Sequence, residues 1–279
     1  MRQHYFNGLN DDGFHKLAYV EWGDPQNHDI IVCVHGLTLN GRYFDWFSKA
    51  CEDHYRVICP DVVGRGRSDW IPPQHYWYPQ YVRDAASLMA RLGTDKVNWV
   101  GTSMGGLIGV HIAAMPNHPI KRLVLNDVGP FVSAAGQKGI SEYIGKDERF
   151  ANHDELEAHL RKLYPKFGDL SKVQWRHLAR VGGLETEDND LRLAYDPAIR
   201  HAFAAWEGDF TLWDLWDKID IPVLILRGSE SNILSQETLD EMLARNHNAT
   251  CHVFEGIGHA PPLMAGDQID IILDFLAKG

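Results

Sequence analysis

The stretch Gly101-Thr-Ser-Met-Gly105 places a serine between two glycines, each two positions away. It follows the apolar run VNWV and leads into the small residues of GLIGVHIAA, a pattern typical of a strand, a sharp turn and a helix. The flanking glycines leave room for the close backbone approach that such a turn requires. A serine presented in this way can attack a carbonyl carbon, so Ser103 is the candidate nucleophile.

A histidine near the end of the chain can supply the base that this serine needs. His259 stands in Gly256-Ile-Gly-His-Ala260, shortly after the apolar run HVF. A glycine-flanked loop beyond the last strand can carry an imidazole across the edge of a sheet. The other histidines are expected at the surface or in the core. We therefore predict that His259 is the general base.

Two backbone amides are candidates for stabilising the negative charge that develops on the substrate oxygen. His35-Gly-Leu-Thr38 follows the apolar run IIVCV, and a loop at this point can direct an N–H toward the reacting carbonyl. We predict that the amides of Leu37 and Met104 form this oxyanion hole. His35 is expected to support the loop rather than to act in catalysis, and it is included among the residues that could contact substrate.

A second glycine-containing stretch, Asp61 to Ser68 (DVVGRGRS), could be read as a nucleotide-binding loop. It lacks the third glycine of a dinucleotide-binding turn and the lysine of a phosphate-binding loop. We interpret it as a structural loop at the rim of the pocket. No cysteine and histidine spacing typical of a metal site is present either, so no cofactor and no metal are predicted.

Short apolar runs alternate with helical patterns along most of the chain. Strands are predicted at residues 17–22, 30–34, 56–59, 97–100, 123–125, 223–226 and 252–254, and helices at 79–92, 105–115, 235–245 and 267–276. Several strands are apolar at consecutive positions, which favours a parallel sheet covered on both faces. Residues 17–22 alternate instead and predict an antiparallel edge strand. The fold class predicted is α/β with right-handed crossovers.

The alternation stops between residues 131 and 216. Helix-like, charged segments such as ELEAHLRKLY fill this interval, and no strand is predicted there. We interpret residues 131–216 as a helical cap inserted after the sixth strand, over a core domain made of residues 1–130 and 217–279. Trp206, Phe210 and Trp213, together with the run from Tyr76 to Tyr78, are candidates for the walls of a substrate pocket.

The composition limits the possible partners. The 279 residues carry a formal net charge of −11 and no run of lysine and arginine, which argues against binding to nucleic acid or to anionic membranes. The four cysteines show no pairing motif, and no apolar segment is long enough to cross a membrane. We expect a cytoplasmic protein, monomeric or homodimeric, that acts on a small molecule.

Taken in order, HGLT, DVVGRGRS, GTSMGG and GHAP resemble the motifs of the α/β-hydrolase superfamily, specifically its cap-bearing bacterial serine hydrolases. The resemblance covers the chain apart from the insertion. It implies an eight-stranded, mostly parallel sheet, with Ser103 as nucleophile and His259 as base. It also implies an acid between these two residues in the sequence, after the seventh strand, that orients the imidazole.

The chain departs from the family pattern at this acid. Similar members have an aspartate where this sequence has Asn232, in LRGSESNIL. A neutral amide cannot stabilise the imidazolium and can favour the wrong tautomer, a change that lowers kcat about 10⁴-fold in a serine protease. We take Asn232 to occupy the acid's place, either by nature or by engineering. Asp127, past the sixth strand, and Glu230 are the alternative acids.

The function expected is a serine hydrolase that cleaves carboxylic esters of small to medium acyl or alcohol groups through an acyl-enzyme. One alternative is a carbon–carbon bond hydrolase or a perhydrolase built on the same triad. The other, motivated by Asn232, is a ligand-binding protein that keeps the pocket but has lost turnover.

Overall fold

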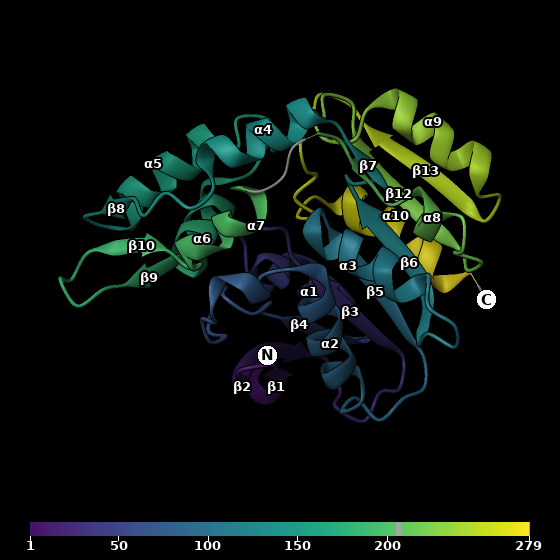
Figure 1. The fold of residues 1–279 in the computed structure, drawn as a ribbon, viewed down its shortest axis with the longest axis horizontal. Coiled ribbons are helices and arrows are strands. Elements are labelled where there is room, and N and C mark those ends of the chain that lie inside the picture. Colours follow the sequence, from purple (N-terminus) through teal and green to yellow (C-terminus); the bar gives the residue numbers. More distant parts are fainter. Residues whose placement is uncertain (205–207, 279) are drawn as a thin grey trace.

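The chain folds around one large sheet, shown in Figure 1. In this computed structural model, residues 1–204 and 208–278 are described. The sheet has eight strands in the order β1-β2-β4-β3-β5-β6-β12-β13. Their bounds are β1 Arg2–Asn10, β2 Gly13–Trp22, β3 Ile30–Val34, β4 Arg56–Pro60, β5 Val97–Thr102, β6 Ile120–Asn126, β12 Val223–Gly228 and β13 Ala249–Phe254.

Most of the sheet is parallel, as the apolar runs predict. Every pair from β4 to β13 runs parallel, and only β1 and β2 are antiparallel to their neighbours. Every residue of β3 and of β5 is buried, because helices cover both faces. The prediction of an edge strand at residues 17–22 is wrong, since β2 pairs with β1 on one side and β4 on the other. The strand at this edge of the sheet is β1, which was not predicted because its sequence is mostly polar and contains no apolar run.

The helices of the core pack in two layers. Buried side chains of α2, α3 and α9 join one apolar cluster, and those of α1 and α10 join the other. The four predicted helices are present to within a few residues. The bounds are α1 Asp45–Cys51, α2 Tyr78–Met89, α3 Met104–Ala113, α9 Gln236–Arg245 and α10 Gly266–Ala277, with short 3₁₀ turns η1 Gly41–Phe44, η2 Pro73–His75 and η3 Pro197–Arg200.

No described strand of the interval between β6 and β12 joins the main sheet, and the elements from α4 to α7 lie to one side of that sheet in Figure 1. Its elements are β7 Phe131–Val132, α4 Ala134–Tyr143, β8 Arg149–Phe150, α5 His153–Leu163, α6 Lys172–Gly182, β9 Gly183–Glu185, β10 Leu191–Leu193, α7 His201–Ala204, β11 Phe210–Thr211 and α8 Trp213–Trp216. The expectation that it holds no strand is wrong. Its strands have only two or three residues each, too few for an alternating pattern to show.

The inserted segment is closed where it begins and ends, and backbone hydrogen bonds hold it against the core. β7 pairs with β11, so the chain leaves and re-enters the core at one place. Farther out, Gly66 N–H donates to the carbonyl of Ala194, and Asp196 N–H donates to the carbonyl of Gly64, each at 2.8 Å. The loop after β4 therefore holds the middle of the insertion against the core. No helix among the described residues is long and apolar enough to span a bilayer.

Candidate active site

Ser103 occupies the sharp turn between β5 and α3. Its backbone has φ 52° and ψ −117°, a left-handed conformation that strains a residue other than glycine by roughly 1–3 kcal/mol. A side chain at Gly105 would collide with the carbonyl of Val34, and one at Gly101 would collide with the backbone of Gly105. Gly105 is thus required for the turn to sit against β3, and Gly101 is required for the start of α3 to pack against the end of β5. Ser103 N–H donates to the Asn126 carbonyl of β6 at 3.0 Å, which anchors the turn.

The imidazole of His259 faces this serine. Its Nε2 atom lies 3.0 Å from Ser103 Oγ, although the two residues are 156 positions apart. The loop after β13 that carries it is held by Gly258 N–H, which donates to the Lys166 carbonyl of the inserted segment at 2.9 Å. About 18% of the His259 side chain is exposed. The serine and histidine chosen from the sequence are therefore within proton-transfer distance.

Asp127 is the carboxylate beside this histidine. Its Oδ2 atom lies 2.7 Å from His259 Nδ1, and its side chain is fully buried. The hydroxyl of Ser231 donates to the same oxygen at 2.6 Å, and Gly228 N–H donates to Oδ1 at 2.8 Å. These donors stabilise the ionised carboxylate inside the protein. With Nδ1–H donated to Asp127, the lone pair of Nε2 is directed at Ser103 Oγ.

Asn232 does not occupy the acid's place, which corrects the expectation drawn from the family pattern. Its side chain is exposed and has no hydrogen bond to His259 among the described residues. Glu230 is also excluded from this position, because its carboxylate pairs with Lys166. The residue of this loop that reaches Asp127 is Ser231, the neighbour of Asn232. The sequence analysis overlooked Ser231.

The sheet order explains how an acid from β6 reaches the histidine. β12 lies directly beside β6, so the carboxyl ends of these two strands are neighbours. Asp127 follows β6 with φ 57°, and its N–H donates to the Leu226 carbonyl of β12 at 2.8 Å. A carboxylate at either strand end is therefore close to the same imidazole. In this chain the β6 end carries the carboxylate.

Two backbone amides border the space in front of the serine. Leu37 and Met104 line the same cavity as Ser103. Within the described residues, the Leu37 N–H has no protein acceptor, and Met104 begins α3, where the first amides of a helix have no partner in the helix. Both groups are thus available to a substrate oxygen. The positive end of α3 also points here.

Arg65 is buried directly behind these amides. Its Nε donates to the Leu37 carbonyl at 3.0 Å, and one terminal nitrogen lies 3.6 Å from Met104 Sδ. The guanidinium is fully buried, and no carboxylate pairs with it within the described residues. The Tyr76 and Tyr81 rings lie 5.7 and 5.3 Å from its central carbon. The DVVGRGRS stretch therefore positions the loop that carries Leu37.

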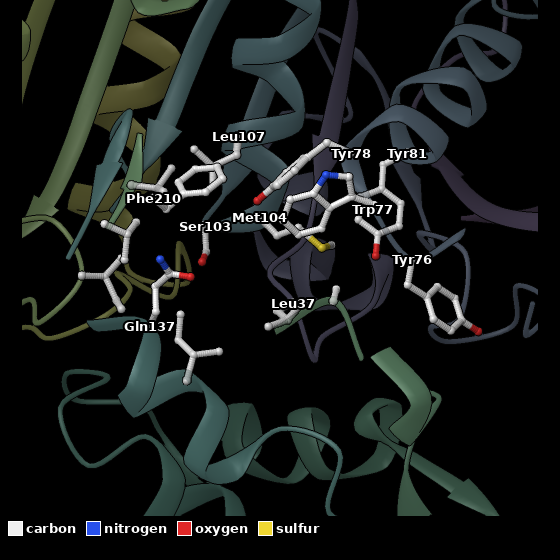
Figure 2. A pocket seen from close by; sticks show the side chains of 15 residues that line it. Leu37, Tyr76, Trp77, Tyr78, Tyr81, Ser103, Met104, Leu107, Gln137 and Phe210 are labelled. Atoms are coloured by element: carbon white, nitrogen blue, oxygen red, sulfur yellow. The ribbon is translucent and has the colours of Figure 1, made fainter. Parts of the chain in front are cut away.

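Ser103 opens into an apolar cavity with about 670 Å³ of empty space, counting its mouth. Figure 2 shows Ser103 pointing into it beside Gln137, with Phe210 and the tyrosines of the 76–81 stretch around them. No lysine, arginine, aspartate or glutamate lines it in the described part of the chain. Its walls come from the core and the insertion: Leu37, Tyr76, Trp77, Tyr78, Tyr81, Met104, Leu107, Val128, Val132, Gln137, Ile140, Ala202, Phe210 and Ile233.

Phe210 and the run from Tyr76 to Tyr78 line this cavity, but His35 and Trp213 do not. His35 is fully buried, with Nε2 accepting from Val62 N–H at 2.9 Å, so it supports the loop and does not reach the substrate space. Burial lowers the pKa of His35 to about 3, which keeps its ring neutral. Trp213 packs under the guanidinium of Arg245, 4.6 Å from its central carbon. Trp206 lies outside the described residues.

A serine in a strand–turn–helix at the carboxyl end of a central parallel strand, hydrogen-bonded to a histidine that a carboxylate orients, defines a class of serine hydrolases. The sequence model of the alpha/beta hydrolase family matches residues 31–270. The chain belongs to the alpha/beta hydrolase family. This confirms the predicted superfamily and the predicted fold, with its eight-stranded, mostly parallel sheet.

Individual relatives are similar to this chain over most of its length. The chain is 41% identical to a 3-hydroxybutyrate-oligomer hydrolase of Cupriavidus necator, over 96% of this chain and 94% of that protein. It is 25% identical to a bifunctional esterase/perhydrolase of Acinetobacter calcoaceticus, over 91% of this chain and 93% of that one. A crystal structure of a hydrolase from Rickettsia typhi superimposes with a TM-score of 0.92 at 32% identity and covers both chains fully. The prediction that the chain is a hydrolase is confirmed.

Proposed function

We propose that the protein hydrolyses carboxylic esters of short hydroxy acids, with Ser103 as nucleophile, His259 as general base and Asp127 as the acid of the triad. The observation that carries the proposal is the continuous chain of hydrogen bonds from Asp127 through His259 to Ser103. Its last member opens into an apolar cavity lined by both the core and the insertion. The relative named a 3-hydroxybutyrate-oligomer hydrolase supports this substrate class.

The proposed reaction begins with proton transfer from Ser103 Oγ to His259 Nε2 as the oxygen attacks the ester carbonyl. Asp127 stabilises the imidazolium through the 2.7 Å contact to Nδ1. The carbonyl oxygen gains negative charge and accepts hydrogen bonds from the amides of Leu37 and Met104. His259 then protonates the leaving alcohol, which leaves an acyl group on Ser103.

Water then hydrolyses the acyl-enzyme, with water in place of Ser103 as the attacking group. His259 removes a proton from the water as it attacks the acyl-enzyme, and then returns that proton to Ser103 Oγ as the acid leaves. The apolar walls, including Tyr78 and Phe210, favour the short carbon chain of the acyl group. Gln137 is the amide in this cavity that can bind a hydroxyl group on the substrate.

The inserted segment, residues 131–216, acts in this proposal as a cap over the core formed by residues 1–130 and 217–279. It supplies Val132, Gln137, Ile140 and Phe210 to the cavity, and the core supplies Ser103. Because both parts line one space, we expect the cap to select the acyl group. The ligand-binding alternative rested on Asn232 and loses its support, since His259 has a carboxylate partner.

The test compares Ser103→Ala with the wild-type protein on p-nitrophenyl butyrate and on the dimer of 3-hydroxybutyrate. We expect kcat to fall by at least about 10⁴-fold on both esters, because no other group replaces the nucleophile. A fluorophosphonate probe should label the wild type and not the variant. Ser87→Ala, on α2, is the matched control and should keep both properties. Equal hydrolysis by wild type and Ser103→Ala would contradict the proposal.

A further inference from the structure

A second cavity lies on the other side of the loop that carries the proposed oxyanion donor. Its lining includes Thr38, the residue after Leu37, together with Lys146 and Lys162 from the inserted segment. Leu37 itself lines the Ser103 cavity. Consecutive residues of one loop therefore separate the two cavities. We call the second one the lysine cavity.

The lysine cavity has an excess of positive charge. Glu148, the carboxylate among its lining residues, pairs with His159 at 3.0 Å. Neither Lys146 nor Lys162 has an ion-pair partner among the residues that the structure describes. The two ammonium groups outnumber the carboxylate at this cavity, although the whole chain carries a net charge of −11. They can attract an anion in spite of the overall charge.

Hydroxyl groups add to these charges. Tyr143 and Tyr195 also line the lysine cavity, and Tyr195 is only 2% exposed. Burial raises the pKa of each phenol, so both keep their protons and can donate hydrogen bonds. Thr38 adds a third hydroxyl at the boundary with the core, 3.3 Å from the hydroxyl of Tyr164, which can act as its donor. Ammonium groups with neutral O–H donors form a set that binds a carboxylate.

The Ser103 cavity has the opposite character. Because its described lining contains no charged side chain, a carboxylate placed there would lose its hydration without gaining a partner. A hydroxy-acid ester with a free acid end is ionised above about pH 5. Its acid end must therefore lie outside the Ser103 cavity while the ester carbonyl sits at the serine. The lysine cavity begins one residue farther along the loop.

We propose that the lysine cavity binds the free carboxylate end of the ester substrate, while the hydroxyacyl end fills the Ser103 cavity. This inference rests on the proposed function and makes it more specific. It implies that the enzyme acts on oligomers with an ionised acid end in preference to the same oligomers with that end blocked. Because Lys146 and Lys162 contribute to binding and not to chemistry, their loss should act on KM.

The test measures kcat and KM on three esters: the 3-hydroxybutyrate dimer as its free acid, the methyl ester of that dimer, and p-nitrophenyl butyrate. We expect the wild type to prefer the free acid over the methyl ester about tenfold in kcat/KM, the size expected of two exposed charge interactions. In Lys146→Met/Lys162→Met this preference should vanish through a higher KM for the free acid. The rates on the other two esters should stay within twofold.

A matched control removes the same charge elsewhere. Lys172→Met/Lys218→Met loses two exposed lysines that do not line the lysine cavity, and it should keep the wild-type preference. Equal kcat/KM for free acid and methyl ester in the wild type would overturn the inference while Ser103-dependent hydrolysis stands. A parallel loss on all three esters in the Lys146→Met/Lys162→Met variant would also overturn it. If the wild type hydrolysed none of the three esters, that result would instead contradict the proposed function.

Discussion

Replacing Asp127 by asparagine is the sharpest test of the active-site geometry. The side chain is fully buried and lies 2.7 Å from His259 Nδ1, so the substitution removes a charge next to the imidazolium that forms during attack. Two unit charges about 4 Å apart interact by about 4 kcal/mol at an effective dielectric constant of about 20. At about 1.4 kcal/mol per decade, this loss corresponds to roughly 10³-fold in kcat.

The amide also changes the hydrogen bonding. Asparagine can keep one oxygen for Gly228 N–H, but its NH₂ group would then face His259 and Ser231. A donor at that point favours the tautomer with its proton on Nε2, which cannot accept the proton of Ser103. This second effect brings the expected loss in Asp127→Asn to about 10³–10⁴-fold. KM should change little, because Asp127 does not line the Ser103 cavity.

The assay is steady-state hydrolysis of p-nitrophenyl butyrate, with thermal melting to verify that each variant is folded. Asn232→Asp is the matched variant, since it puts a carboxylate where the family pattern expects one. We expect its rate to stay within about twofold of the wild type, because Asn232 is exposed and Nδ1 of His259 is already paired with Asp127. Asp127→Asn/Asn232→Asp should be as slow as Asp127→Asn.

Two results would refute this reasoning. One is an Asp127→Asn variant that keeps more than a tenth of the wild-type kcat. The other is an Asn232→Asp variant that gains orders of magnitude, because that gain would mean that the loop after β12 supplies the working acid.

Three further predictions follow from neighbouring contacts. Ser231→Ala should lower kcat about tenfold, since it removes the 2.6 Å hydrogen bond to the Asp127 carboxylate; an unchanged kcat would show that this bond is dispensable. Arg65→Met should lower kcat about 10–100-fold with little change in KM, because the Leu37 loop loses its donor, whereas exposed Arg67→Met should match the wild type. Finally, burial holds the pKa of His35 at about 3, against 6.5 in the unfolded chain, so only the unfolded chain takes up this proton between those values. The free energy of unfolding should therefore fall as pH decreases below about 6.5, and less steeply in His35→Gln; parallel urea-unfolding profiles of the two proteins would contradict this.

The sequence by itself determined the local parts of the site. The glycines around Ser103 and the apolar run before it specify a strained turn, because only glycine tolerates the backbone contacts that this turn makes. The apolar runs likewise specified the parallel strands, and the loop after the last strand singled out His259. Each of these inferences depends only on residues that are neighbours in the chain, and the structure contains each predicted turn, strand and loop.

The tertiary structure alone decided which side chain faces the histidine. Asp127 and Asn232 are 105 positions apart in the chain, but β6 and β12 are adjacent in the sheet, so both strand ends approach one imidazole. A pattern along the chain carries no information about which of two neighbouring loops bends inward. Burial and hydrogen bonding decide it: Asp127 is enclosed with Ser231 and Gly228 as donors, while Asn232 faces solvent. The same holds for Arg65, whose burial behind Leu37 depends on contacts that only the folded chain makes.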